Sequence, residues 1–306
     1  MEFEKDKSTA AVDHSKRVTM VILILWFFPV LCLAKSKKNQ LTYTNKSKNK
    51  ASKLFVKKDN KSGFPAIVGK AKPLLPLIVL DPGHGGKDPG AIGYSGTYEK
   101  HISYAVSLEL LKQLTHTGRY RVKLTREIDQ FIPLDGRVEF AQKHKANLFI
   151  SLHADALGNH SVRGASVYTL SNHASDSLSA ALATTENSAD RYAGPNVKVV
   201  SPAVQKILAS LVQLETKKES MTLAKTVVRS FNNRVGLLNN PRRHAGFVVL
   251  KSCDVPSILV EMGFMSNRMD ESQLRKAMYQ GLVASSLKNA INHYFDIGGS
   301  ITHLTG

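Results

Sequence analysis

The sequence predicts an α/β fold in which a mostly parallel, twisted sheet is covered by helices on both faces. Two observations carry this prediction. Apolar runs of strand length alternate along the chain with segments whose apolar residues recur at helical spacing. The domain expected from residue 75 to residue 297 is also of ordinary single-domain size. Alternating strands and helices are typical of parallel sheets with helices on both faces.

The first expected strand, Leu77–Leu80, is apolar throughout and stops at a loop with four glycines and two prolines. A helix is expected next, over residues 98–114, because apolar residues recur there at helical spacing and Gly118 follows as a stop. Further strands are expected at 120–125, 147–153, 164–170, 246–250 and 257–261, and further helices at 135–145 and 272–294. In such sheets a ligand binds beyond the carboxyl ends of the strands.

The first 34 residues indicate export. An uncharged run from Val18 to Leu33 follows Lys16-Arg17 and ends at a small residue, Ala34, which is the layout of a secretory signal peptide. An uncleaved N-terminal membrane anchor is the alternative for residues 1–34. One of the two cysteines lies inside this segment, so the domain has no disulfide framework.

Residues 35–74 predict a basic, flexible linker. The chain has a net charge of +18, and residues 35–70 contain eleven lysines but only one acid, Asp59. This stretch lacks the apolar periodicity of a folded element. A nucleic-acid-binding domain would gather basic and aromatic residues on its folded part. Here the excess is weighted to the linker, so no specific nucleic-acid partner is expected.

Polar residues follow the expected strands at the points where a ligand should bind. His84 comes just after the first strand, His153 ends the NLFISLH strand, and Glu261 ends SILVE. Glu99 stands at the start of the first helix. Two histidines and a carboxylate can fill three corners of a tetrahedral zinc site, and a second carboxylate can move the proton of a water molecule. Alternatively, Glu99 caps its helix and His153 is a core histidine.

These segments resemble the zinc-dependent N-acetylmuramoyl-L-alanine amidases of the Amidase_3 type, and specifically the periplasmic cell-division amidases. The matching motifs are LDPGHGGKDPGAIG, Tyr98-Glu99-Lys100, RVKLTRE, FISLHADA, RGASVYTLS, AGFVVLKS and VPSILVEMGFMSN, which together span residues 75–295 in order. The resemblance implies zinc ligands at His84, Glu99 and His153 and a catalytic base at Glu261. It implies that Asp155 lies beside the metal as an extra ligand or as a partner of the ligands, and the alternative is that Asp155 caps a turn.

The implied reaction is hydrolysis of the amide between N-acetylmuramic acid and L-alanine in peptidoglycan, during septal wall splitting in the periplasm. Arg126 or Arg163 could meet the carboxylates of the acidic stem peptide, although solvation at the surface is the favoured role for each. The division amidases usually carry an N-terminal septal targeting domain, and the lysine-rich linker does not resemble one. A zinc peptidase acting within the stem peptide and a non-catalytic cationic wall-binding protein are the rival interpretations.

The middle of the chain has two interpretations. Apolar residues from position 201 onward fall on one helical face, which ordinary packing against the domain explains; they are Val204, Ile207, Leu208, Leu211 and Val212. The resemblance instead implies an inserted helical regulatory segment, residues 171–220, that covers the active site until a LytM-type activator moves it. Glu186 is then the acid expected to reach the zinc, with Glu215 as the alternative.

Overall fold

The computed structural model describes residues 74–192, 208–252 and 254–299. The expected signal peptide or anchor and nearly all of the expected linker lie outside these ranges, as do Val204 and Ile207. Within them, no helix combines the length and the apolar character that crossing a membrane requires.

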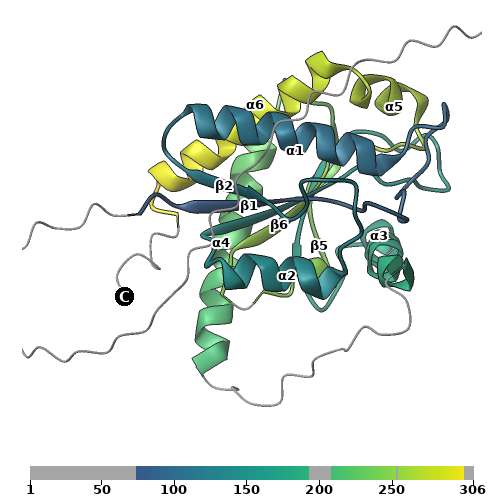
Figure 1. Ribbon diagram of the computed structural model, residues 1–306. Helices are drawn as coiled ribbons and strands as arrows, with labels where there is room; N and C mark the ends of the chain where they lie inside the picture. The colour runs from purple at the N-terminus through teal and green to yellow at the C-terminus, as the bar shows by residue number, and fades with distance from the viewer. Residues whose placement is uncertain (1–73, 193–207, 253, 300–306) are drawn as a thin grey trace, which may run out of the picture. The chain divides into compact units, whose positions relative to one another are not determined.

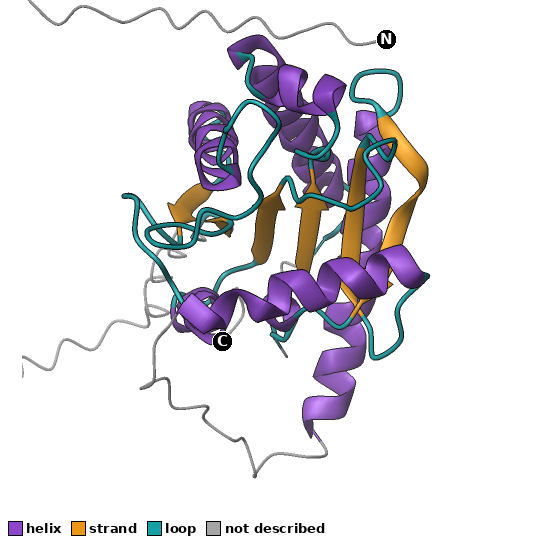
Figure 2. Cartoon of the chain, turned by 90° about the vertical axis from the view of Figure 1, so that its right-hand side faces the viewer, coloured by secondary structure: helices purple, strands orange, loops and turns teal. Residues whose placement is uncertain are grey.

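Within the described residues, six strands form one sheet in the order β2-β1-β3-β6-β4-β5. Their bounds are β1 Leu77–Pro82, β2 Arg121–Leu124, β3 Leu148–His153, β4 Ala165–Leu170, β5 Leu237–Ala245 and β6 Ser257–Glu261. Strands β2, β1, β3 and β6 run parallel, β4 is antiparallel to β6, and β5 is parallel to β4. The strands lie side by side in Figure 2. The mostly parallel sheet expected from the sequence is confirmed.

Helices cover both faces of this sheet. They are α1 Glu99–His116, α2 Leu134–Lys143, α3 Ser177–Asn187, α4 Leu208–Phe231, α5 Arg268–Leu274 and α6 Ala277–Asp296, with short 3₁₀ helices η1 Ser188–Tyr192 and η2 Val248–Leu250. In Figure 1, α1 and α6 lie above the sheet, and α2 and α3 lie below it. Helix α4 contributes to the same core as α1 and α6.

The apolar strands are buried on both sides because each faces a core on either side of the sheet. Along β1, Ile78 and Leu80 belong to the core with α1, α4 and α6, whereas Leu77 and Val79 belong to the core with α2, α3 and η2. Successive side chains of a strand point to opposite faces. An unbroken apolar run is therefore what a strand between two helical layers needs.

The prediction of a strand at 246–250 is wrong. That run forms η2 and buries its apolar side chains in a core without joining the sheet. The strand that completes the sheet is instead β5, which directly precedes the 246–250 run. Strand β5 is an edge strand that pairs only with β4, so it is largely polar, and it tolerates Pro241 and a left-handed Asn240 with φ 53°. Its pairing with β4 also shifts register between Ala165 and Val167.

The middle of the chain contributes to both faces of the sheet. Helix α3 packs on one face through Leu182 and Ala183. Helix α4 packs on the other through Leu223 and Val227, in its second half. The expected boundary of the insertion at residue 220 therefore falls inside α4. The expected closing helix is likewise two helices, α5 and α6, separated by an extended backbone at Lys276.

Candidate metal centre

Three parallel strands end side by side at one edge of the sheet. Pro82 of β1 is paired with Leu152 of β3, and His153 of β3 is paired with Glu261 of β6. The loop after β1 carries His84, and helix α1 returns to the same edge with Glu99 as its first residue. The residues that the sequence places after different strands therefore meet in space.

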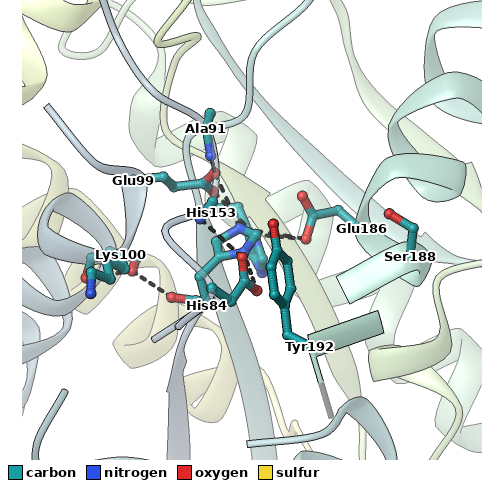
Figure 3. Close-up of polar contacts among 12 residues, drawn as sticks. His84, Ala91, Glu99, Lys100, His153, Glu186, Ser188 and Tyr192 are labelled. Atoms are coloured by element: carbon teal, nitrogen blue, oxygen red, sulfur yellow. Dashed lines mark hydrogen bonds and ion pairs between the residues drawn. The ribbon is translucent and has the colours of Figure 1, made fainter. Parts of the chain in front are cut away.

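Four buried side chains converge at this edge. His84, Glu99, His153 and Glu186 each offer one ligand atom, and these atoms all lie within 4.8 Å of one another. The Nε2 atom of His84 is 3.1 Å from Glu99 and 3.7 Å from Glu186, and the Nδ1 atom of His153 is 3.2 Å from Glu99 and 3.1 Å from Glu186. Figure 3 shows the imidazole rings and the two carboxylates turned toward one another.

The loop that carries His84 is held in a left-handed conformation by buried hydrogen bonds. His84 has φ 60°, a value that few residues other than glycine adopt. Arg137 donates a hydrogen bond to the His84 carbonyl over 3.0 Å, and Gly85 and Asp88 exchange backbone hydrogen bonds. On the ring itself, Nδ1 is 2.9 Å from Asp88 Oδ2, so Nε2 faces the cluster. The sequence reasoning missed Asp88, whose signal was its place four residues after His84 in the same glycine-rich loop.

The two glutamates of the cluster have opposite pKa shifts. Burial by itself would raise the pKa of Glu99, but the nearby His84 and His153 outweigh it and hold that pKa well below its ordinary value. Glu99 also accepts hydrogen bonds from the backbone amides of Ala91 and Ala154, at 2.8 and 2.7 Å. Burial raises the pKa of Glu186, and the two imidazoles only partly offset this. Glu99 is therefore the more firmly fixed anion of the two.

Glu261 and Asp155 lie beside the four-residue cluster. The Asp155 amide donates to Glu261 Oε2 over 3.1 Å, while Glu261 Oε1 has no hydrogen-bond partner. Burial, and then the charge of Asp155, raise the pKa of Glu261 well above its ordinary value. Burial, followed by the charges of Glu186 and Glu99, does the same for Asp155. A raised pKa makes a carboxyl group more readily protonated, which favours a role in accepting and returning a proton.

Other residues singled out in the sequence lie elsewhere. Glu215 is exposed on α4 and pairs with Lys218 at 3.8 Å. Arg126 is 2% exposed and donates hydrogen bonds to three backbone carbonyls, those of Pro82, Gly83 and Lys100. Both interpretations of Arg126, solvation at the surface and contact with substrate carboxylates, are therefore wrong, because its guanidinium group is used inside the protein. Arg163 is partly exposed and lies 3.4 Å from Asp270.

The donor set fits a zinc ion. Imidazole nitrogens and carboxylate oxygens are zinc ligands, and atoms about 2.0–2.1 Å from a tetrahedral zinc lie about 3.4 Å from one another. The nitrogen–oxygen distances between the imidazoles and carboxylates of the cluster, 3.1–3.7 Å, bracket that value. In addition, Glu186 Oε1 is buried without a hydrogen-bond partner. Burying such an atom costs free energy that a bound cation would offset.

The cluster should be sensitive to a single methyl group at Gly83. A Cβ there would lie 2.4 Å from the nearest ring atom of His153. We expect Gly83→Ala to displace this ring and to weaken zinc binding more than tenfold, as measured by competition with a chromophoric chelator. Gly281→Ala is the matched control, since its methyl group meets open space in α6. Equal zinc affinities of the two variants would contradict the assignment of His153 as a ligand.

A hollow much larger than the space at this cluster lies elsewhere among the described residues. It has a volume of about 250 Å³ and lies between α4 and the residues around Leu170, Leu250 and Ser257. Ser257 is the first residue of β6 and Glu261 is the last, so this hollow lies at the opposite end of the strand from Glu261. The cavity beside the cluster is only about 10 Å³ and is lined partly by Glu186 and Ala189. That volume is about the size of one water molecule.

Comparison with known proteins agrees with this geometry. The N-acetylmuramoyl-L-alanine amidase family, Amidase_3, matches residues 78–293. The amidase AmiA of Salmonella typhimurium is 41% identical over 220 residues, which cover 72% of this chain and 76% of that protein. The amidase AmiC2 of Nostoc punctiforme has a TM-score of 0.52 at 27% identity, covering 72% of this chain and 97% of that one. The CwlD amidase of Clostridioides difficile, in complex with the GerS lipoprotein, has a TM-score of 0.54 at 25% identity, covering 72% and 99%. The chain therefore belongs to the N-acetylmuramoyl-L-alanine amidase family.

Proposed function

We propose that this protein is a zinc-dependent amidase that hydrolyses the bond between N-acetylmuramic acid and L-alanine in peptidoglycan. The observation that carries the proposal is the buried cluster of His84, Glu99, His153 and Glu186 at the ends of parallel strands in a chain of this family. Membership of the family and the identity to AmiA support the substrate and the bond.

In this proposal His84, Glu99 and His153 are the zinc ligands. Their contacts support the assignment, because each imidazole turns one nitrogen toward Glu99. Glu99 in turn is fixed by two backbone amides. A zinc ion bound there would polarise the substrate carbonyl and lower the pKa of a water molecule.

Glu261 is the proposed catalytic base. One of its oxygens accepts the Asp155 amide, so the carboxylate is oriented, and the other oxygen is unpartnered and free to accept a proton. Glu261 would take the proton of the attacking water and return it to the departing amine of L-alanine. Asp155 positions this carboxylate through its backbone, and its charge helps to raise the pKa of Glu261.

We also propose that Glu186 keeps the enzyme inactive. Its carboxylate stands at the fourth corner of the cluster, where water and substrate would have to enter. The cavity left beside it is about 10 Å³, far too small for a stem peptide. Helix α3, which carries Glu186, would have to move before the enzyme can act. The proposed trigger is a LytM-type activator protein, and the proposed setting is septal wall splitting in the periplasm after export through residues 1–34.

Metal removal tests the proposed reaction. We expect a chelator to abolish release of stem peptides from purified sacculi by the full chain carrying Glu186→Ala, in which the proposed block is removed, and added zinc to restore it. Product analysis identifies the bond, since an amidase leaves intact sugar strands and whole stem peptides. Shortened stem peptides would instead support a zinc peptidase. Binding of the Glu186→Ala variant to sacculi without any release, at any zinc concentration, would support a non-catalytic wall-binding protein.

A further inference from the structure

The second ring nitrogen of His153 contacts a buried polar network. Its Nε2 atom is 3.1 Å from the hydroxyl oxygen of Ser151, two residues earlier in β3. Ser151 is 2.7 Å from Oδ2 of Asp81, near the end of the neighbouring strand β1. Residues two apart in a strand point to the same face. The three side chains therefore form a line from the cluster into the interior.

The hydrogen bonds of Asp81 determine which way the protons point. Its other oxygen, Oδ1, accepts from Arg137 at 2.8 Å and from the Thr125 hydroxyl at 2.6 Å. The guanidinium group keeps the buried carboxylate ionised, and an ionised carboxylate only accepts hydrogen bonds. Ser151 must therefore donate its single hydroxyl proton to Asp81.

A serine hydroxyl whose single proton is used in the hydrogen bond to Asp81 can only accept a hydrogen bond from His153. The donor must then be an Nε2–H group, which leaves the lone pair of Nδ1 pointing at the cluster. This agrees with the position of Nδ1, 3.2 Å from Glu99 and 3.1 Å from Glu186. His84 has the opposite arrangement, because Asp88 holds its Nδ1 and Nε2 faces the cluster.

We propose that Asp81 and Ser151 form a positioning pair that fixes the His153 tautomer and thereby sets the affinity of the centre for zinc. The inference rests on the proposed function, since it assumes that His153 binds zinc. A simpler role for Asp81 is to hold Arg137, which donates to the carbonyls of Pro82 and His84. That role would not require Ser151, so the two are separable by experiment.

The test compares Ser151→Ala with Thr125→Val. Each variant removes one hydroxyl donor to Asp81, and both hydroxyls are buried, but only Ser151 touches His153. We expect Ser151→Ala to weaken zinc binding by about 10–100-fold, the usual effect of losing an outer partner of a ligand. Thr125→Val should retain wild-type affinity within about threefold. Chelator competition on the full chain measures both.

Histidine NMR of the zinc-loaded protein gives a second measurement that does not depend on activity. In the wild type, we expect the His153 ring to bind zinc through Nδ1 and to show a slowly exchanging proton on Nε2. In Ser151→Ala this proton should exchange faster, and in Thr125→Val it should not. The wild-type spectrum remains decisive even if Ser151→Ala does not fold, because zinc on Nε2 of His153 would overturn the inference.

The outcomes separate this inference from the proposed function. A wild type that binds no zinc would overturn the proposed function and this inference with it. A wild type that binds zinc and cleaves sacculi, together with a Ser151→Ala variant of equal affinity and equal proton exchange, would overturn the inference alone.

Discussion

Glu261→Gln should abolish almost all hydrolysis of sacculi while leaving zinc bound. The glutamine has the same shape, but its amide cannot accept the proton of a water molecule. General base catalysis contributes about 10²–10⁴-fold to a rate, and we expect a loss of kcat in that range. Zinc content should stay at the wild-type level, because Glu261 is not one of the four residues that converge on the ion site. Release of stem peptides and metal analysis of the same sample measure both quantities.

The matched control is Glu219→Gln. Glu219 lies in α4 and accepts a hydrogen bond from Tyr294, away from the cluster. This variant makes the same chemical change in a glutamate that has no proposed part in the reaction, so its rate should equal that of the wild type. Wild-type activity of Glu261→Gln with normal zinc content would remove Glu261 from the mechanism.

Glu186→Ala should have the opposite effect and raise the rate without an activator. Glu186 is 3% exposed, and its carboxylate contacts both imidazoles. Removing this side chain opens one corner of the cluster and removes one contact that holds α3 in place. If most molecules are closed, the rate scales with the open fraction. We expect an increase of about tenfold or more in sacculus hydrolysis by the full chain. Adding Glu261→Gln to this variant should silence it again.

Glu215→Ala distinguishes the two acids considered for this role. Glu215 lies in the same part of the sequence but is exposed and pairs only locally, with Lys218. We expect the activity of this variant to stay at the low level of the unmodified chain. An unmodified chain that already works at its maximal rate, or activation by Glu215→Ala but not by Glu186→Ala, would contradict self-inhibition through Glu186.

The sequence located much of the candidate site because chemistry and local pattern coincide there. His153 and Glu261 end apolar strands, where a polar residue is costly without a task, and His84 follows the strand that opens the domain. The supporting residues carry no such signal. Ser151 is an ordinary residue in a strand, and its bond to Asp81 spans 70 positions, so only the register of β1 and β3 reveals it.

The fold was less predictable where an element's structure depends on its position in the sheet and core rather than on its own apolar pattern. Strand β5 is polar because it lies at the edge of the sheet, so it lacks the apolar run that marks a strand. The apolar run after it packs as η2 instead. Glu186 shows the same limit, because nothing in its neighbourhood marks it as a ligand. Its expected role came only from the resemblance to the division amidases, and its contact with the two imidazoles required the position of α3.

Glu186 is the second-to-last residue of α3. The free carbonyl groups at the end of a helix carry a partial negative charge, which disfavours a nearby carboxylate and favours a cation. With zinc in the centre, this end of α3 would be drawn toward the ion by the Glu186 side chain. In the proposed mechanism, the ion that the reaction needs would thus also hold in place the helix proposed to prevent it. Loss of zinc would loosen α3 without activating the enzyme. Displacement of α3 would therefore depend on a partner that binds outside the centre.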